Sequence, residues 1–338
     1  MGDTEKLKKM LANKSVLYIS TKNIDYIRTN QEIEMLKSWC KNCKVISYED
    51  KSYITRLRKC IVGILTVDIK PFDYVFIGFM AQMLVPFFWW KWHEKIIITD
   101  FFISVYDTLV DDRKKVQASS LLGKMLKGLD KRTICKSDYI IADTLAHKEF
   151  FVNEFGAKEQ ECLVVYLNAD KEIYYPRIVD KPDLYKNKFV VLYFGSILPL
   201  QGVKYVLDSI RLLQHRKDIH FVMVGPLEGK CKKVESDNVT YIHWLSQEEL
   251  AEYIAFSDLC LGGHFDPDIG KANRTIPGKV YIYEAMGKTM ILGDSLANHE
   301  LFVCDQQHQY VKMGSGQAIA DCIMKNFSES EHCECYES

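Results

Sequence analysis

Short apolar runs rich in β-branched residues alternate with longer stretches of helical periodicity along almost the whole chain. The apolar runs cover residues 16–20, 44–48, 74–78, 95–99, 139–142 and 163–167 in the first half, and 190–194, 220–224, 239–242, 258–261 and 290–292 in the second. Helical periodicity in the second half covers residues 202–214, 247–256 and 278–286. This alternation predicts an α/β protein in which helical crossovers join parallel strands.

A segment without apolar periodicity interrupts the alternation at residues 174–188, where two prolines and many charged residues indicate a linker. A chain of 338 residues also exceeds the usual size of one hydrophobic core. We therefore expect two doubly wound parallel-sheet domains, residues 1–178 and 179–338, with a cleft between them. The C-terminal tail either stays with the second domain or returns to the first.

Composition excludes several classes of protein. With 48% apolar residues and a formal net charge of −1, the chain is globular and has no net attraction to nucleic acid. Its start lacks the apolar core of a secretion signal, no run of apolar residues is long enough to span a bilayer, and eleven irregularly spaced cysteines do not form a disulfide framework. We expect a cytoplasmic protein with reduced thiols, and the sequence leaves a homo-oligomer open.

Two short groups of metal-binding residue types occur, Cys40 with Cys43, and His332 with Cys333 and Cys335. Neither has a second matching pair at the spacing that a zinc site needs, so both are weak signals. We expect no metal and no other cofactor.

The aromatic run at residues 76–92, FIGFMAQMLVPFFWWKW, has two interpretations. Aromatic runs usually fill cores, which favours a buried strand followed by a packed helix. The alternative is a patch that rests on a membrane face, supported by the basic and apolar segment RLRKCIVGIL at residues 56–65. The two interpretations are compatible, since part of the run can be buried while another part faces a membrane.

The segment 266–294 is suited to hold a phosphorylated ligand. Lys271, Arg274 and Lys279 surround Pro277, where a short helix is expected to begin. A helix start presents free N–H groups and the positive end of the helix dipole, so an anion attracted by the cations would also be stabilised there. Earlier in the same half, Gly195 directly follows an apolar strand and Gly202 precedes a helix, a pattern that lets backbone approach a phosphate.

A family resemblance rests on these pieces. The glycine turn at Gly195, the VGP at residues 224–226, the segment VTYIHWLSQEELAEYIAFSDLCL and the stretch IPGKVYIYEAMGKTMILGD resemble, in order and spacing, the C-terminal domain of GT-B glycosyltransferases of family four. LNADKEIYYP at residues 167–176 is similar to the signature before the family's interdomain crossover, and TDFFISVYDTLVDDR is similar to a segment of a bacterial surface-polysaccharide subgroup. The resemblance implies two Rossmann-like domains and a retaining, nucleotide-sugar-dependent enzyme, a hexosyl- or N-acetylhexosaminyltransferase of class EC 2.4.

The resemblance also implies a donor site in the second half. Its residues are Gly195, Ser196, Gln201, Gly225, Trp244, Leu245, Lys271, Arg274, Lys279 and Glu284. Within this set Glu284 matches the second glutamate of the family's Glu-x7-Glu motif, which grips the donor ribose, and we assign catalytic roles to Lys279 and Glu284. For Glu284 the alternative to ribose binding is an ion pair with a lysine on a surface helix. For Trp244 the alternative to stacking on the base is a position in the hydrophobic core.

The chain departs from the family at three positions. Ile276 replaces the first glutamate of the motif, and Asp266 or Asp268 from the preceding loop could substitute for it. Ser196 and Gln201 stand where the family has an arginine and a lysine, so cations from elsewhere must neutralise the leaving diphosphate. Lys271, Arg274 and Lys279 are the evident replacements, a pattern typical of the subgroup.

The acceptor side is expected in the first half. Asp100 ends a strand where the family often has a sugar-contacting histidine, so we assign it a catalytic role. We also expect Arg28, on the loop after the first strand, and Ser104, Tyr106 and Asp107 to bind the acceptor. The alternative for Asp100 and Ser104 is helix capping.

The function predicted from the sequence is transfer of a sugar from a nucleotide diphosphate to a saccharide. The acceptor is expected to be lipid-linked, at the inner face of the membrane, with the protein attached there peripherally. Two other classes stay open. One is a catalytically idle GT-B subunit that supports an active partner, and the other is a nucleotide-sugar epimerase, which would need acidic or histidine groups able to act on a sugar carbon.

Overall fold

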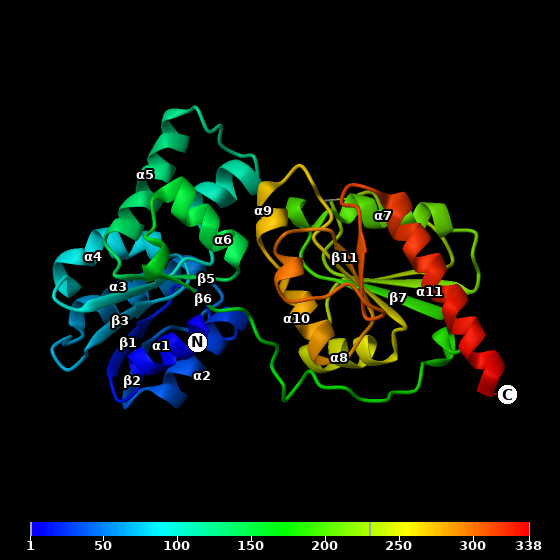
Figure 1. Cartoon of the computed structure of the whole chain (residues 1–338), viewed down its shortest axis with the longest axis horizontal. Coiled ribbons are helices and arrows are strands. Elements are labelled where there is room, and N and C mark those ends of the chain that lie inside the picture. The colour runs from blue at the N-terminus through cyan, green and yellow to red at the C-terminus, as the bar shows by residue number, and fades with distance from the viewer. Residues whose placement is uncertain (1, 230, 338) are drawn as a thin grey trace. The chain divides into compact units, whose positions relative to one another are not determined.

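The computed structural model describes residues 2–229 and 231–337 and divides into two compact units, Met1–Asn168 and Ala169–Ser338. Each unit holds one six-stranded sheet whose paired strands are all parallel (Figure 1). The doubly wound α/β fold expected from the sequence is confirmed. The linker expected at residues 174–188 belongs to the second unit and contains only the short helix η5 (Asp183–Tyr185).

The first unit has the strand order β2-β1-β3-β4-β5-β6. Its strands are β1 (Ser15–Ile19), β2 (Asn42–Ile46), β3 (Tyr74–Ile77), β4 (Ile96–Asp100), β5 (Tyr139–Ala142) and β6 (Cys162–Val164). Its helices are α1 (Asp3–Leu11), α2 (Ile27–Trp39), α3 (Tyr53–Thr66), α4 (Val85–Trp92), α5 (Leu121–Cys135) and α6 (Leu145–Phe150), with the short helical segments η1 (Ala81–Met83), η2 (Asp107–Asp112), η3 (Phe151–Phe155) and η4 (Glu159–Glu161).

Alternating residues of the strands in the first unit pack against different helices. Leu17 and Ile19 of β1 lie in a buried cluster with side chains from α3 and α4, whereas Val16 and Tyr18 lie in a cluster with side chains from α1 and α2. Successive side chains of a strand point to opposite faces of a sheet. The sheet is therefore covered by α1 and α2 on one face and by α3 and α4 on the other.

The second unit has the strand order β12-β11-β10-β7-β8-β9. Its strands are β7 (Phe189–Phe194), β8 (Ile219–Val224), β9 (Val239–Ile242), β10 (Leu259–Gly263), β11 (Met290–Gly293) and β12 (His308–Val311). Its helices are α7 (Val203–Leu213), α8 (Gln247–Phe256), α9 (Gly270–Arg274), α10 (Gly278–Ala285) and α11 (Gly316–Glu337), with η6 (Pro199–Gln201) and η7 (Asn298–Glu300).

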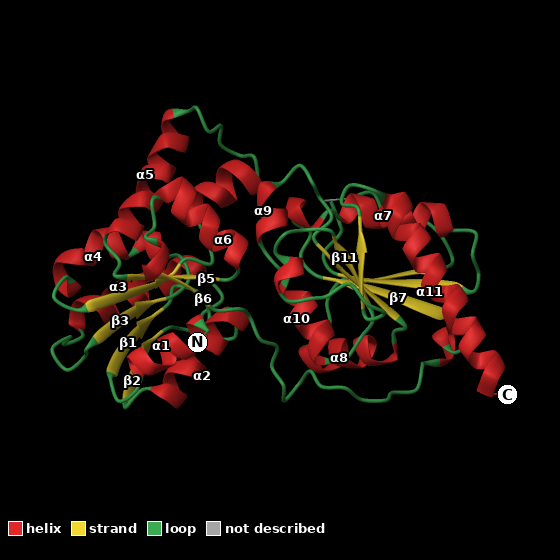
Figure 2. Ribbon diagram, viewed as in Figure 1, coloured by secondary structure: helices red, strands yellow, loops and turns green. Residues whose placement is uncertain are grey.

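Helices cover both faces of this second sheet (Figure 2). Long apolar side chains of α7 and α11, among them Ile210 and Ile323, share one buried cluster with Val191 and Tyr193 of β7. On the other side, Tyr283 of α10 packs edge-on against Phe194, with ring centroids 5.3 Å apart. The C-terminal helix α11 thus lies along α7 within the second unit.

The aromatic run at residues 76–92 combines features of both interpretations. It forms the end of β3, then η1 and α4, and Trp92 is fully buried. Phe87 and Trp90, however, are each 61% exposed on α4. Over the described residues, none of the helices combines the length and the apolar character that crossing a bilayer requires.

Candidate functional site

Two glycines bring the loops after β7 and β8 into contact at the carboxyl edge of the second sheet. Gly195 has φ 140° and Gly225 has φ 146°, and a Cβ on Gly225 would lie 2.3 Å from the carbonyl oxygen of Gly195. The Gly195 N–H donates to the Val224 carbonyl at 3.0 Å. Because no side chain fits at this crossing, the two loops leave bare backbone at the edge where α/β sheets bind ligands.

Lys279 crosses from the first turn of α10 to this glycine pair. Its Nζ lies 3.6 Å from the centroid of the Tyr193 ring, and a Cβ on Gly195 would come within 3.2 Å of the same atom. The residue is only 5% exposed, and Nζ has no hydrogen-bond partner among the described residues. Burial holds the pKa of Lys279 well below its usual value.

An amine buried in this way is costly, because the charged form loses its hydration and gains only a cation–π contact. An anion placed at Gly195 would supply the missing acceptor and favour the charged form. Pro277 precedes α10, so the helix also directs its first N–H groups toward the same end. The arrangement is thus suited to bind a phosphate.

His264 stands beside this cation, directly after β10, and is 3% exposed. The Thr275 hydroxyl donates to the Lys271 carbonyl at 3.0 Å, so its oxygen is available to accept from His264 Nε2, 3.4 Å away. This assigns the proton to Nε2 and leaves Nδ1 as an acceptor, which has no partner within residues 2–229 and 231–337. Burial first, then the cations of Lys279 and Lys271, hold the pKa of His264 well below its usual value.

His264 is not among the residues predicted from the sequence. The available signal was its position after the strand LCLGG, where the chain reaches the carboxyl edge of the sheet. A histidine at that point can equally be a core residue, and only the structure shows that one of its ring nitrogens has no partner among the described residues.

The other cations of the segment lie on α9. Lys271 is 7% exposed and Arg274 is half-buried, and both have interactions within the protein. Ile276, in the position of the missing glutamate, is buried. Asp266, one of its suggested substitutes, instead forms an ion pair with Lys204 at 3.0 Å and accepts from the Asp268 N–H.

Ser196 and Gln201 bring no charge to the glycine pair. Gln201 Oε1 lies 3.5 Å from the Tyr193 hydroxyl, and Gly202, the residue before α7, has φ 64°. A pocket of about 410 Å³ opens beside this helix start, lined by apolar residues of 197–203, Cys231 and the Lys204–Asp266 pair.

Trp244 is exposed, so its alternative interpretation as a core residue is wrong. It follows β9 and has 73% of its surface exposed, next to the half-buried Leu245. The neighbouring His243 contacts Glu228 from the loop after β8, with Nδ1 and Oε2 3.1 Å apart. An exposed indole at the carboxyl edge of the sheet can stack on a planar ring.

The structure does not bring Glu284 to the glycine pair. Its Oε2 accepts from His308 Nε2 at 2.7 Å and from Gln307 Nε2 at 3.1 Å. His308 is the first residue of β12 and pairs with Met290, the first residue of β11. Glu284 therefore lies near the amino ends of the strands, whereas Lys279, about 7.5 Å earlier along α10, lies near the carboxyl ends. Its partners are a histidine and a glutamine, and the alternative pair with a lysine is wrong.

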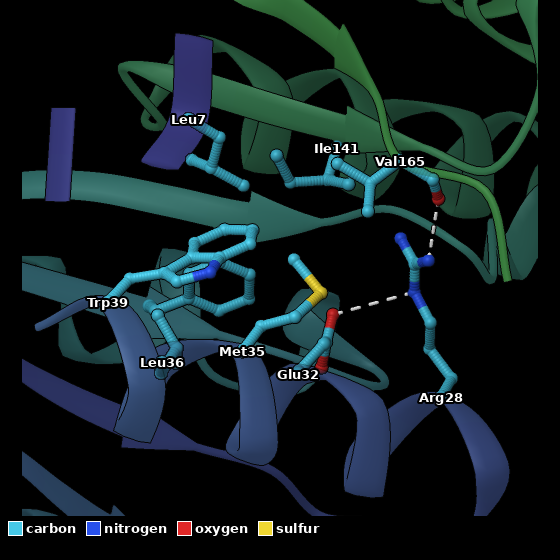
Figure 3. A pocket seen from close by; sticks show the side chains of 9 residues that line it. Leu7, Arg28, Glu32, Met35, Leu36, Trp39, Ile141 and Val165 are labelled. Atoms are coloured by element: carbon cyan, nitrogen blue, oxygen red, sulfur yellow. Dashed lines mark hydrogen bonds and ion pairs between the residues drawn. The ribbon is translucent and has the colours of Figure 1, made fainter. Parts of the chain in front are cut away.

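In the first unit, Arg28 and Asp100 form a buried ion pair. Arg28 lies on α2, so its predicted loop position is wrong. Its guanidinium donates to both Asp100 oxygens, at 3.1 and 3.2 Å. It also donates to the Val165 carbonyl at 2.6 Å, and Glu32 lies 3.6 Å away (Figure 3). Burial, then the nearby Asp100, raises the pKa of Glu32 well above its usual value. Arg28 and Asp100 are each 2% exposed, so the pair braces α2 against β4.

The remaining predicted acceptor residues form a second internal network. Ser104 Oγ donates to Asp130 at 2.7 Å and accepts from the Asp107 N–H at 2.9 Å, which is the capping alternative for this serine. The Tyr106 N–H donates to Asp130 as well. Asp107 is fully buried, with one carboxylate oxygen 3.8 Å from His147 Nε2.

His147 links that network to the carboxyl end of β5. Its Nδ1 lies 2.6 Å from Asp143 Oδ1. Burial lowers the pKa of His147, but the carboxylates of Asp143 and Asp107 outweigh it, so that the net pKa is raised. Over the described residues, no group of three or more His, Cys, Asp or Glu side chains could hold a metal ion, and the side chains of His332, Cys333 and Cys335 lie outside that part of the chain.

Comparison with known proteins defines the class. Residues 188–328 match the family model described as glycosyl transferases group 1. Sucrose-phosphate synthase from Thermosynechococcus elongatus superposes with a TM-score of 0.66 at 9% identity, covering 93% of this chain and 90% of that one. Anabaena HepE, solved with UDP and glucose, gives a TM-score of 0.66 at 13% identity, covering 94% and 91%.

A curated sequence also matches, an uncharacterized 41.2 kDa protein in the cps region of Klebsiella pneumoniae. It is 23% identical over 211 residues, which are 60% of this chain and 56% of the Klebsiella protein. The chain has the fold of the GT-B glycosyltransferases, and its second unit carries a group 1 glycosyl transferase domain. The match of residues 188–328 agrees with the expected enzyme class, a glycosyltransferase.

Proposed function

We propose that the protein is a retaining glycosyltransferase of family four that takes its sugar from a uridine diphosphate donor. One observation carries the proposal: the ammonium of Lys279, buried and without a hydrogen-bond partner among the described residues, lies against the glycine crossing of β7 and β8. The donor diphosphate would lie on the bare backbone of Gly195 and Gly225 and accept from Lys279.

Three further groups fit the remaining parts of such a donor. The exposed indole of Trp244 offers a platform for the base. The first N–H groups of α10 add to the positive field at the diphosphate. His264 Nδ1 is an acceptor, so it can pair only with a group that donates, and the hydroxyls of the transferred sugar are such groups, whereas the phosphate oxygens are not.

The chemistry follows from where charge develops. As the bond from the anomeric carbon to the β-phosphate oxygen breaks, the diphosphate gains negative charge, and Lys279 neutralises it more strongly than in the ground state. The acceptor hydroxyl attacks the anomeric carbon on the same face, and its proton passes to the departing phosphate oxygen. This path retains the anomeric configuration without a protein nucleophile, and we propose that it needs no divalent metal.

Lys279 is also suited to supply the positive charge that Ser196 and Gln201 do not carry. Those two positions bring no cation to the glycine crossing, but Nζ of Lys279 reaches it from the first turn of α10. Lys271 and Arg274 on the adjacent α9 add positive charge nearby. The proposal does not rest on Glu284, whose predicted contact with the ribose would require the side chain to leave His308.

For the acceptor we propose a lipid-linked saccharide in surface-polysaccharide assembly, used at the inner face of the membrane. The position of the Klebsiella relative in a cps region and the exposed aromatic residues of α4 support this choice. Arg28 and Asp100 are buried in their mutual ion pair, so their predicted acceptor roles would be indirect, through the position of α2 against β4.

The test is turnover with a panel of nucleotide sugars. Release of the nucleoside diphosphate is measured with and without a lipid-linked saccharide, and the anomeric configuration of the product is read by NMR. We expect acceptor-dependent release of UDP and a retained configuration. No release with any donor, together with normal UDP binding, would favour the idle subunit, and sugar rearrangement without acceptor would favour the epimerase.

A further inference from the structure

Three helices of the first unit share one face of its sheet. As described above, α3 and α4 pack on the face that carries Leu17, Ile19 and Ile97. Ile97 and Thr99 lie on the same face of β4, and Thr99 pairs with Ile140 of β5. Ile140 packs in a buried cluster with Ile134 of α5. The helices α3, α4 and α5 therefore form one layer on this face of the sheet (Figure 1). The outward sides of these helices together make one surface of the unit.

This surface, which we call the docking face, carries large apolar side chains on all three helices. Cys60, Ile64 and Trp92 point inward and fill the core. The exposed apolar residues are Ile54, Val62 and Leu65 on α3, Phe87, Trp89 and Trp90 on α4, and Leu121, Leu122 and Met125 on α5. Leu121 has 77% of its surface exposed, and seven of the other eight have more than half. Single exposed apolar residues are ordinary, but such a set on one layer indicates an interaction surface.

The charges of the same helices are almost all positive. Exposed or half-buried basic residues are Arg58, Lys59, Lys91, Lys124, Lys127, Lys131 and Arg132. Asp130 is the one carboxylate in α3, α4 and α5, all of whose residues are described, and it is fully buried beneath Ser104. Since the whole chain has a formal charge of −1, this face is far more basic than the rest of the protein.

Most of this charge is available to an external partner. Lys59 and Lys127 have carboxylate partners from outside the three helices, Asp50 and Glu154. Arg58, Lys124, Lys131 and Arg132 have no ion-pair partner among the described residues. Two lysines hold the layer together, because Lys91 donates to the Leu65 carbonyl at 3.0 Å and Lys136 lies 3.6 Å over the Trp89 ring.

We propose that the docking face binds the surface of an anionic lipid bilayer. Aromatic and aliphatic side chains enter the boundary between headgroups and acyl chains, while lysine and arginine keep their charges at the headgroups. The three helices carry clustered lysine and arginine and no exposed acidic residue, so they complement anionic headgroups along the whole layer. This uniform positive charge favours a lipid surface over a protein partner. The inference adds a site of attachment to the proposed function and stands independently of the donor chemistry.

The experiment is flotation of the full chain with vesicles of phosphatidylcholine alone and of phosphatidylcholine mixed with phosphatidylglycerol. We expect binding to the mixed vesicles that weakens with added salt, and little binding to the neutral ones. Two variants test the face, the charge variant Arg58→Gln with Lys124→Gln and the apolar variant Phe87→Ser with Trp90→Ser. Each basic residue removed should lower the partition coefficient about fivefold.

The controls are Lys8→Gln on α1, which covers the other face of the sheet, and Val303→Ser, an exposed position in the second unit. Both should bind vesicles as the wild type does. Absence of binding to mixed vesicles, equal binding to neutral vesicles, or unchanged binding by both face variants would overturn the proposal. So would a face variant that dissociates an oligomer and leaves vesicle binding intact. Calorimetry with UDP on the same samples shows whether each variant is folded. It also tests the donor site by itself, so that a failure of vesicle binding can be distinguished from a failure of donor binding.

Discussion

Substitution of Lys279 by methionine should weaken the binding of a nucleoside diphosphate and at the same time stabilise the unliganded protein. Methionine has a similar length and no charge, so the variant removes the buried amine without opening a large cavity. A charge-assisted hydrogen bond contributes about 1.5–3 kcal/mol, which corresponds to a loss of UDP affinity of about tenfold to a hundredfold.

The gain in stability has the same origin. In the unliganded protein Lys279 Nζ has no hydrogen-bond partner among the described residues, and relief of such a buried polar group is worth about 1–3 kcal/mol. Because the native pKa lies below that of the unfolded chain, the unfolded chain binds more protons, and wild-type stability should rise with pH until the unfolded lysine titrates. The variant should lose this rise.

The assay is calorimetric titration with UDP and with UMP, together with thermal unfolding. UMP lacks the outer phosphate, so we expect Lys279→Met to reduce the difference in affinity between the two nucleotides. Lys204→Met is the matched control, since this lysine lies at the same edge of the sheet but pairs with Asp266. Unchanged UDP affinity in Lys279→Met, or an equal loss in Lys204→Met, would show that Lys279 is not the specific partner of the outer phosphate.

Further predictions concern the same site. UDP affinity of the wild type should fall by up to tenfold per pH unit above the lowered pKa of Lys279, because binding then takes up a proton, and titration of Lys279→Met across the same pH range should show a smaller slope. Gly225→Ala should abolish UDP binding or reduce it at least tenfold, since its Cβ would lie 2.3 Å from the Gly195 carbonyl oxygen, whereas Gly229→Ala, at a positive φ with no atom near its Cβ, controls for backbone strain. His264→Ala should lower kcat/KM for the sugar nucleotide about tenfold while UDP affinity stays within about twofold, which separates sugar contact from phosphate contact. For Glu284→Gln the placement beside His308 predicts UDP affinity within about twofold of wild type and a lower melting temperature, whereas a ribose contact predicts a tenfold loss in calorimetry.

Much of the fold follows from local sequence patterns. Apolar runs bounded by polar residues predict β7, β8 and β9, and the helical period predicts α7, α8 and α10 to within a residue or two. The elements β12, α9 and α11 were not predicted. The strand β12 has the sequence HQYV, whose burial comes from pairing with β11 and from neighbours that no local pattern encodes.

The site residues whose role depends on backbone geometry could be predicted from the sequence. Those whose role depends on the direction of a helix were harder to predict. Gly195 and Gly225 follow strands, and the structure shows them in contact at the carboxyl edge. Lys279 and Glu284 share one short helix and were predicted to serve one ligand. Because α10 returns toward the amino ends of the strands, its first turn and its last turn lie near opposite edges of the sheet.

Tertiary pairing explains the differences in the first unit. Arg28 and Asp100 have the polar character of ligand-binding residues, but 72 positions apart in sequence they satisfy each other inside the protein. The Ser104 hydroxyl likewise donates to Asp130 and accepts from the Asp107 N–H. A sequence lists such groups without showing which of them are already paired. Only the structure shows that Lys279 Nζ and His264 Nδ1 have no hydrogen-bond partner in the part of the chain that it describes.

The most direct test of the donor site is a crystal structure of the protein with UDP bound. We predict that the outer phosphate lies on the Gly195 backbone, with one of its oxygens about 2.8 Å from Lys279 Nζ. A diphosphate bound away from Lys279, for example in the pocket beside α7, would contradict it.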